Sequence, residues 1–572
     1  MSEKSNKRRA IFAVTALMLT MTCLGIFLGR VYDRHRMREY MKTYTQSTTI
    51  APTEEQFAAD LLALEQYLLN SDKLMQTIVG IRTMYVDHID VDSIYEIVIP
   101  KLLAELDPHS EYIPAKYFDK VNESLEGEFD GIGIVFNAMT DTITVLNVIP
   151  QGPSDRAGVR AGDRIMLIDE RLVAGQKISQ DSMMRLMRGP RNSNVKLSIK
   201  RSGLDEYVDI NVKRAPIELH SIEAAFMLDS ESKIGFVRLS QFSRTSHTEM
   251  RQAIDTLRKE GAEALIIDLR GNTGGFLDQV ILIADEFLPA GRLIVYTEDR
   301  EGRRQQQFSS GRGHSTDIAL AILVDEGSAS SSEILAGAVQ DNDRGLVIGR
   351  RTFGKGLVQT QIPFADGSAI RLTVARYYTP TGRSIQKPYK RGDGMAYHLE
   401  LLDRYNNNEL FTADSIHFAD SLRYTTPAGR TVYGGGGIMP DIFIPADTTR
   451  FTDYYAKAWN TNVLYRYTLD FTDRHRHEIE AVDDLQALDS LLSAYDLIGE
   501  FTAYAERHGL STNHRELATS RDIILAQIRA YIARNAFDDE SGFYYNILPI
   551  DDAMLRAVEE MKKELAKTRD ND

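Results

Sequence analysis

Residues 319–340 read ALAILVDEGSASSSEILAGAVQ. The apolar run 319–324 predicts a buried strand, the small residues 327–332 predict a tight turn, and 333–340 predict the helix that the turn opens. Such a turn leaves backbone N–H groups free at the helix start. Ser330 lies in the turn, so we expect its hydroxyl beside N–H groups that can hold a negatively charged oxygen. The stretch therefore predicts an α/β fold with a candidate nucleophile where a strand ends.

A candidate base follows the next strand. That strand is predicted at 345–348 and leads to Thr-Phe-Gly-Lys-Gly at 352–356. Lys355 stands between two glycines, which allow other backbone to approach closely. Burial there would remove water that stabilises the ammonium ion, because a charged group loses solvation inside a protein. The pKa of the lysine would then fall, and the lysine could act as the general base for a serine.

Simpler interpretations exist for both motifs. A serine-rich turn before a helix is often only a helix cap. Residues 349–355 also satisfy the first seven positions of the phosphate-binding pattern G-x-x-x-x-G-K-[ST]. The eighth position is Gly356, which has no hydroxyl for magnesium, and an alternating strand follows in place of the helix that would hold a phosphate. We therefore reject nucleotide binding.

At these positions the chain resembles the carboxy-terminal processing proteases, also called tail-specific proteases, which are serine peptidases with a Ser–Lys dyad. The resemblance rests on S-A-S-S-S-E-I at 328–334 and on T-F-G-K-G-L-V-Q at 352–359. It implies that Ser330 is the nucleophile, that Lys355 is the general base, and that Gln359 orients the lysine.

A PDZ domain is predicted at 115–214. The phrase F-D-G-I-G-I-V-F at 129–136 opens a strand from a glycine-containing loop, and A-G-V-R-A-G-D-R-I at 157–165 matches a turn characteristic of these domains. Residues 183–187 fit the helix that would line the ligand's side-chain pocket. In PDZ domains the loop holds a peptide's terminal carboxylate with N–H groups while the peptide adds as an extra strand. The residues expected to bind the carboxylate are Gly131, Ile132, Gly133 and Ile134.

A second strand–turn–helix unit follows the PDZ region. An apolar strand at 264–269 ends in R-G-N-T-G-G at 270–275, and a helix is predicted at 276–287. The family resemblance implies that this turn supplies part of the oxyanion hole and that the residue after the nucleophile supplies the rest. Dinucleotide binding is the alternative for such a turn, but G-x-G-x-x-G is absent. The expected oxyanion donors are Gly274, Gly275 and Ser331.

The N-terminal sequence predicts a membrane anchor. Basic residues within 1–9 precede the apolar stretch 10–29, which is just long enough to span a bilayer. The basic flank should stay in the cytoplasm, and the bulk of the chain should face the periplasm from a bacterial inner membrane. A cleaved signal peptide is the main alternative, although no clear cleavage site follows. Lipidation of Cys23 is a weaker alternative, because apolar sequence continues past it.

Composition limits the classes of partner. The net charge of −15, with no basic stripe to offset it, argues against nucleic acid. His475 and His477 are two residues apart, which does not suit a metal site on one helix face. We expect neither a metal nor an organic cofactor.

The expected fold is multidomain α/β, because 572 residues are too many for one core. After the anchor come a stalk and helical region at 30–114, the PDZ domain, a protease core at 215–446 with an insertion near 387–430, and a helical extension at 447–572. The expected function is a serine endopeptidase that recognises protein substrates by their free C-termini and cleaves them through an acyl-enzyme. The alternative is a catalytically inactive PDZ-bearing scaffold or regulator. The substrate's identity and whether the chain forms a homo-oligomer stay open.

Overall fold

The structure is a computed structural model. Two units of the chain, Met1–Tyr95 and Glu96–Asp572, are compact and are described separately. The predicted anchor at 10–29 lies outside the described residues, and none of the helices within them is long and apolar enough to cross a membrane. The described residues are 72–137, 142–149, 151–176, 178–201, 203–229, 231–537 and 540–571.

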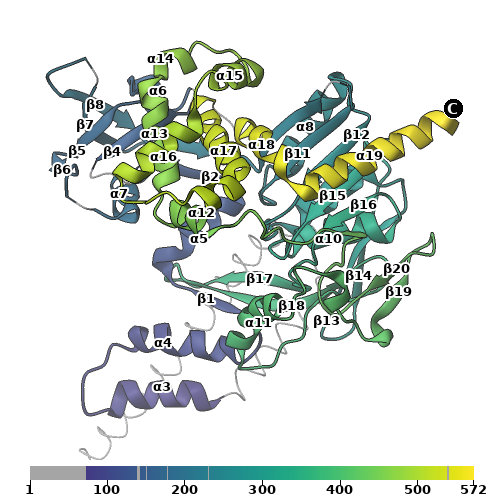
Figure 1. Cartoon of the computed structure of the whole chain (residues 1–572). Helices are drawn as coiled ribbons and strands as arrows, with labels where there is room; N and C mark the ends of the chain where they lie inside the picture. The colour runs from purple at the N-terminus through teal and green to yellow at the C-terminus, as the bar shows by residue number, and fades with distance from the viewer. Residues whose placement is uncertain are drawn as a thin grey trace, which may run out of the picture. The chain divides into compact units, whose positions relative to one another are not determined.

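Two helices begin the described chain (Figure 1). Helix α3 spans Asp72–Met84, and helix α4 spans Val91–Ala104. Apolar residues at helical spacing predicted helices here, and that prediction is confirmed over these two ranges.

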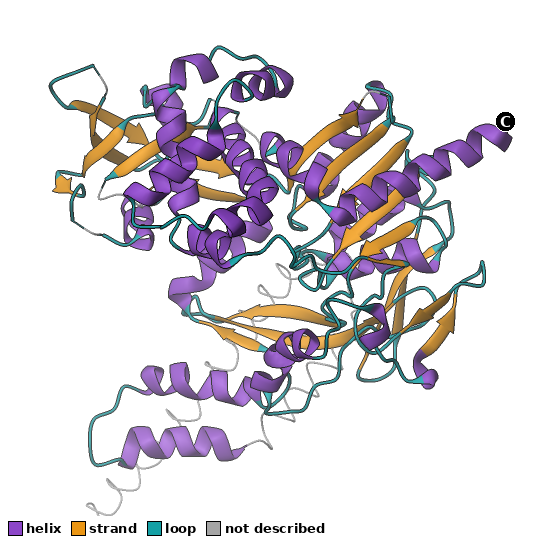
Figure 2. Ribbon diagram, viewed as in Figure 1, coloured by secondary structure: helices purple, strands orange, loops and turns teal. Residues whose placement is uncertain are grey.

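A six-stranded sheet forms the centre of the second unit (Figures 1 and 2). The first pair of strands is antiparallel and the other neighbours are parallel. In spatial order the strands are β10 (Ile222–Asp229), β11 (Ile234–Leu239), β12 (Ala264–Asp268), β15 (Ala319–Val324), β16 (Leu346–Gly349) and β21 (Ile442–Phe443). The helices packed on it are α8 (Ser246–Lys259), α9 (Leu277–Phe287), α10 (Ser331–Asp341) and α19 (Asp552–Asn571).

Both faces of this sheet are buried, which explains the uninterrupted apolar runs of its strands. In β12, Leu265 and Ile267 belong to the core under α8, α9 and α10. Their neighbours Ala264 and Ile266 belong to a second core that includes Met561 of α19. The sequence did not connect the helical extension to the protease core, but its last helix forms a layer of that core.

A second, antiparallel sheet carries the segment after the candidate lysine. Its strands are β1 (Glu111–Ile113), β18 (Ala369–Tyr378), β13 (Leu293–Asp299) and β14 (Arg304–Phe308), and β17 (Leu357–Pro363) also pairs with β18. Because β1 and β17 both pair with β18, the turn that precedes β1 lies close to β17.

The PDZ region contains a sheet whose edge strand is β3. After helix α5 (Ala115–Glu126), the two-stranded ribbon of β2 (Glu128–Gly131) and β9 (Ala215–Glu218) flanks this region in sequence. Met183 and Met187 are only 2% and 4% exposed and pack inside the domain. The sheet and helices are β3 (Ile134–Asn137), β4 (Ile143–Val148), β5 (Arg164–Ile168), β6 (Arg171–Leu172), β7 (Asn194–Lys200), β8 (Val208–Lys213), α6 (Pro153–Ala157) and α7 (Gln180–Met187).

The predicted insertion contains helix α11 (Gly394–Asn406), two short 3-10 turns (Ala413–Ser415 and Asp420–Leu422) and the hairpin of β19 (Arg423–Thr425) and β20 (Thr431–Tyr433). The helical extension has its own apolar core. Its first helices are α12 (Asp453–Asn460), α13 (Val463–Arg474), α14 (Arg476–Ile479), α15 (Leu485–Leu492), α16 (Leu497–Arg507) and α17 (His514–Ala536).

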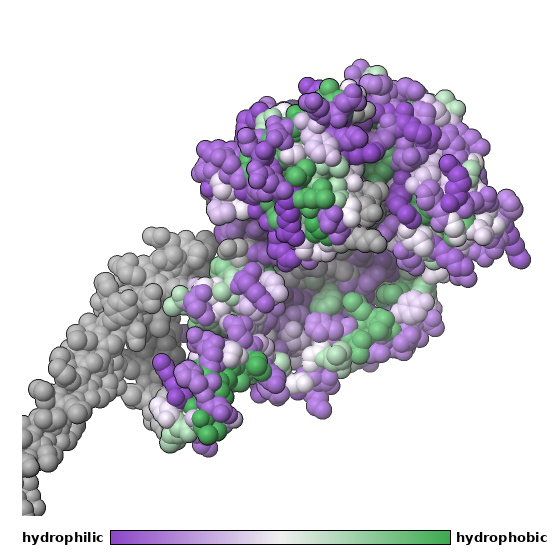
Figure 3. Space-filling view, turned by 90° about the vertical axis from the view of Figure 1, so that its left-hand side faces the viewer, coloured by the Kyte–Doolittle hydropathy of each residue, from purple (hydrophilic) through white to green (hydrophobic). Residues whose placement is uncertain are grey.

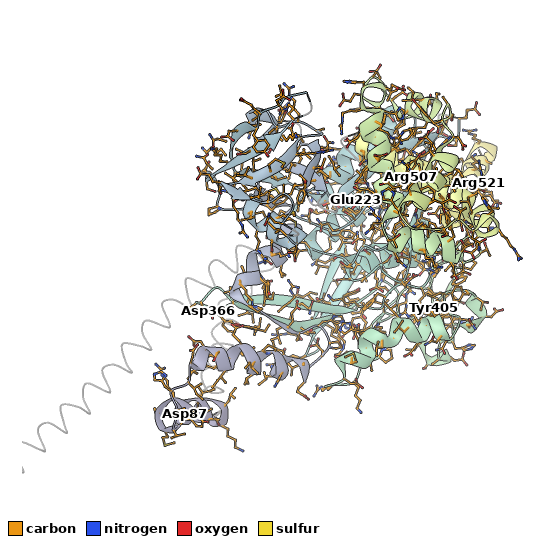
Figure 4. All side chains as sticks on the ribbon, turned by 60° about the vertical axis from the view of Figure 1, so that its left-hand side comes forward. Asp87, Glu223, Asp366, Tyr405, Arg507 and Arg521 are labelled. Carbon is orange, nitrogen blue, oxygen red and sulfur yellow. The ribbon has the colours of Figure 1, made fainter. Side chains whose placement is uncertain are left out.

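Helix α18 (Ser541–Ile547) connects the extension to the central sheet and is followed by the 3-10 turn Leu548–Ile550. The Tyr544 hydroxyl of α18 donates a 2.9 Å hydrogen bond to Glu223 of β10, which Figure 4 labels. The extension is therefore two parts: a helical domain with its own core, and a final pair of helices that packs on the protease sheet.

Candidate active site

Ser330 stands at the junction of β15 and α10, where the sequence predicted it. Its backbone is in the left-handed half of conformational space, with φ 56° and ψ −114°. A residue other than glycine is held in such a conformation only when its surroundings impose it, and strain of this kind gathers at functional sites. The serine is half-buried and lies directly before the first turn of α10.

The glycine-rich turn at 270–275 lies against this serine. A β-carbon on Gly274 would be 2.7 Å from the Ser330 β-carbon and 3.0 Å from the Ser331 nitrogen. The φ of Gly274 is +107°, which also favours glycine. Glycine at this position therefore allows the turn to approach Ser330.

The three expected oxyanion donors differ in availability. The Gly274 N–H donates to the Asn272 side-chain oxygen at 2.9 Å, so it is already engaged. The N–H groups of Gly275 and Ser331 donate to no acceptor within the described part of the chain. The Ser331 hydroxyl donates to the Gly275 carbonyl at 3.0 Å and joins the two segments. Gly275 and Ser331 are the pair that could hold an oxyanion.

Glu333, a residue that the sequence motifs did not mark as functional, links Ser330 to the lysine loop. The N–H groups of Ser330 and Lys355 each donate to the same Glu333 carboxylate oxygen at 2.9 Å. Its other oxygen accepts from the Gly354 N–H at 2.7 Å and from the Thr352 hydroxyl at 2.5 Å. Glu333 is fully buried, so its four donors must come from the protein itself.

Tyr377 of β18 bridges the same two residues from the carbonyl side. Its hydroxyl lies 3.1 Å from the Ser330 carbonyl oxygen and 2.5 Å from that of Lys355. The ring is only 1% exposed. The backbones of Ser330 and Lys355 are thus connected twice, through their N–H groups and through their carbonyl groups.

Burial sets the electrostatics of this site. Burial lowers the pKa of Lys355, and the positive charge of Arg371 lowers it further. Burial raises the pKa of Glu333 to about 7, against the hydrogen bonds that it accepts. Among the described residues, no hydrogen bond joins the Ser330 hydroxyl to the Lys355 ammonium group. Catalytic hydrogen bonds often form only when substrate binds.

Gln359 lies on β17, and its amide donates to the backbone carbonyl of His109. The structure therefore connects this glutamine to the turn before β1, and the orienting contact with Lys355 stays a prediction. His109 Nε2 lies 2.8 Å from the Tyr397 hydroxyl. Burial and the nearby Lys355 charge lower the pKa of His109 to about 4.

The loop at 131–134 has backbone N–H groups that are free within the described part of the chain, and it precedes an edge strand. Gly133 has φ +71°, and a β-carbon there would be 3.1 Å from Ile217 and 3.2 Å from Pro153. The N–H groups of Ile132 and Gly133 donate to no acceptor among the described residues. Their carbonyls accept from other parts of the domain. The next strand, β3, is at the edge of its sheet.

Family comparisons agree with this division of the chain. Residues 233–398 match the model for peptidase family S41, and residues 131–212 match the model for the PDZ domain. Residues 454–538, in the helical extension, match a family of unknown function.

Curated relatives define the family. A carboxy-terminal-processing protease from Bartonella bacilliformis is 38% identical over 311 residues, which cover 54% of this chain and 70% of the relative. A carboxyl-terminal-processing protease from Synechocystis is 37% identical over 294 residues, which cover 50% and 68%. A solved photosystem II D1 C-terminal processing protease is 28% identical, covers 55% of this chain and 89% of its own, and has a TM-score of 0.32. This chain belongs to the carboxy-terminal-processing proteases, a family of serine peptidases in which the PDZ domain accompanies the protease core.

Proposed function

We propose that the chain is an endopeptidase that cleaves with Ser330 and Lys355 and selects substrates by their free C-termini. The observation that carries the catalytic part is the double bridge between these residues, made by Glu333 and Tyr377. Lys355 also lies where burial lowers its pKa, as a neutral base requires.

In this mechanism neutral Lys355 accepts the proton of the Ser330 hydroxyl as its oxygen attacks the substrate carbonyl carbon. The N–H groups of Gly275 and Ser331 hold the negative oxygen that forms. The peptide C–N bond then breaks, and the departing amine takes the proton from Lys355. Water hydrolyses the remaining ester and regenerates Ser330. Gln359 would orient the lysine after releasing the His109 carbonyl.

The PDZ domain would supply substrate selection. The edge of β3 can add a peptide strand, and the loop at 131–134 offers N–H groups to the terminal carboxylate. We propose that Gly131, Ile132, Gly133 and Ile134 form this carboxylate site.

The location is also a proposal. The basic flank at 1–9 and the apolar stretch at 10–29 support a single-pass protein of the bacterial inner membrane whose bulk faces the periplasm. Substrates there would be proteins or peptides with free C-termini.

One substrate protein, prepared with a free and with an amidated C-terminus, tests both parts. The unmodified chain should cleave the free form faster, because charge-assisted hydrogen bonds to the carboxylate are lost in the amide. Ser330→Ala and Lys355→Ala should each abolish cleavage, and the double variant should be little worse than either. Equal rates on the two substrates would refute C-terminal selection, and strong turnover by Ser330→Ala would refute the mechanism.

A further inference from the structure

Helix α11 of the insertion turns one face toward the lysine loop and the other toward solvent. Tyr397, Glu400 and Arg404 are spaced for one helix face, and all three contact the loop at 351–355 or residues packed on it. On the other side, Tyr405, labelled in Figure 4, is 53% exposed, and Met395 is 72% exposed. Figure 3 shows a face of the molecule that is mostly hydrophilic, with smaller hydrophobic patches.

Arg404 makes the decisive contacts. The side chain is only 1% exposed, yet its guanidinium reaches three consecutive backbone carbonyls. It donates to the Thr352 and Phe353 carbonyls at 2.8 and 2.9 Å, and to that of Arg351 at 3.4 Å. Its Nε–H group donates to Glu400 at 2.7 Å, and the carboxylate balances the buried charge.

A buried lysine strengthens this arrangement. The Lys387 ammonium lies 3.9 Å from the centre of the Phe353 ring and 4.3 Å from that of Tyr397, and it donates to Glu400 at 2.9 Å. The Lys387 N–H also donates to the Gly354 carbonyl at 2.9 Å. The insertion therefore holds the loop through the Phe353 side chain as well as through its backbone.

The lysine loop has no regular secondary structure of its own between 351 and 356. On its N–H side it is held by Glu333, which stands in the first turn of the nucleophile helix. On its carbonyl side it is held by Arg404. An irregular loop keeps one conformation only when its polar groups are satisfied in this way.

We propose that α11 is a clamp for the catalytic lysine loop and that Arg404 is a positioning residue, which acts on Lys355 through the carbonyls of 351–353. The inference rests on the proposed Ser330–Lys355 mechanism. It assigns a catalytic role to an insertion whose other face is exposed to solvent.

Two substitutions separate position from charge. Arg404→Lys keeps the positive charge beside Glu400, but its three N–H donors share one nitrogen and cannot reproduce the four donations that the planar guanidinium makes. Arg404→Met removes charge and donors and keeps most of the volume. Arg391→Met, an exposed arginine in the same insertion, is the matched control. Each variant is measured for kcat, KM, the dependence of kcat on pH, and thermal unfolding, with rates expressed per folded molecule.

Both Arg404 variants should lower kcat by roughly tenfold to a hundredfold, because a small displacement of a catalytic group is costly. They should leave KM nearly unchanged, because the proposed carboxylate-binding loop at 131–134 is not altered. The rise of kcat with pH should move to higher pH, because a loosened loop lets water reach Lys355. The charged groups that face this lysine, Arg371, Glu111, Glu333 and Asp107, are unchanged in these variants. A shift in the pH dependence of kcat in Arg404→Lys therefore reports a changed position of Lys355. The control Arg391→Met should behave like the unmodified chain.

Unchanged kcat and pH profile in folded Arg404→Lys would overturn the clamp. If Arg404→Met fails to fold, the lysine variant decides alone. Lys355→Ala is measured in parallel: activity retained there would refute the Ser–Lys mechanism, whereas its loss together with a normal Arg404→Lys would refute only the clamp.

Discussion

The Glu333 carboxylate accepts hydrogen bonds from both parts of the candidate site, the Ser330 turn and the lysine loop. It stands at the third position of α10, where a glutamate commonly accepts from the N-cap backbone N–H. Here the same carboxylate also accepts from Thr352, Gly354 and Lys355. A local motif could predict the bond to Ser330, but the other donors come from a distant loop. For this reason the sequence motifs pointed to Ser330 and Lys355 as candidates and missed the group that joins them.

The variant Glu333→Gln tests this role. An amide offers one acceptor oxygen in place of two and turns N–H groups toward N–H donors, so kcat should fall about tenfold or more. The free energy of unfolding of this variant should also lose the pH dependence that Glu333 contributes. The pKa of Glu333 is raised to about 7 from its ordinary value of 4.5, so its contribution to stability is full below that ordinary value and is lost as pH rises through about 7.

Denaturant unfolding at several pH values across that range measures how steeply the free energy of unfolding changes with pH. Glu326→Gln is the control, because Glu326 is in the turn before Ser330 and its pKa is lowered: burial opposes the shift, and the ion pair with Arg350 outweighs it. If the free energy of unfolding of Glu333→Gln changes with pH as steeply as that of the unmodified chain, another group produces the pH dependence.

At the scale of elements, the sequence predicted what short motifs encode. The strand, turn and helix around Ser330, the corresponding unit at 264–287 and the strand predicted at 345–348 all lie where periodicity and glycine placed them. The contacts of α11 could not be predicted in this way, because Arg404 meets the lysine loop only after the chain has folded back on itself. Likewise, periodicity marks which side of a helix is apolar, but not which element covers it.

The loop before β3 gives a prediction for the PDZ element. Gly133→Ala should reduce the preference for a free over an amidated C-terminus, because the new β-carbon crowds Ile217 and Pro153 beside the expected carboxylate site. Gly175→Ala is a close control: Gly175 has nearly the same φ, +70°, and open space around its β-carbon position. Both variants should lose about 1–2 kcal/mol of stability from the left-handed backbone.

Cleavage rates of the paired substrates then separate the two variants. Only Gly133→Ala should bring the two rates together. Equal loss of preference in both variants would attribute the effect to general destabilisation of the domain.

At the scale of the whole molecule, the helical extension and the protease core share a layer. Arg270, in the turn that carries Gly274, pairs with Asp268 at 2.7 Å and with Asp551 at 2.6 Å. Asp551 directly precedes α19, so the glycine-rich turn and the last helix are connected by an ion pair as well as by apolar packing. The sequence predicted a helical extension, but its separation from the family motifs gave no indication of this contact.

A core substitution in α19 tests this layer. Met561→Ala should destabilise the protease core by roughly 2–5 kcal/mol, because the side chain is 1% exposed and its removal leaves a cavity under the central sheet. Leu555→Ala on the same helix is the control, since Leu555 is 50% exposed. Denaturant unfolding, followed together with cleavage activity, measures the difference. Equal stability of the two variants would show that α19 does not support the sheet.

The position of α19 in the chain has a consequence for biosynthesis. A ribosome releases the strands of the central sheet, and Ser330 in the turn after β15, well before it releases residues 552–571. Until then one face of the sheet lacks its cover, and an apolar face open to water does not hold a fixed shape. We therefore expect the nascent chain to remain without proteolytic activity until the helical extension has emerged from the ribosome. The order of synthesis would then prevent an incomplete chain from cleaving other proteins.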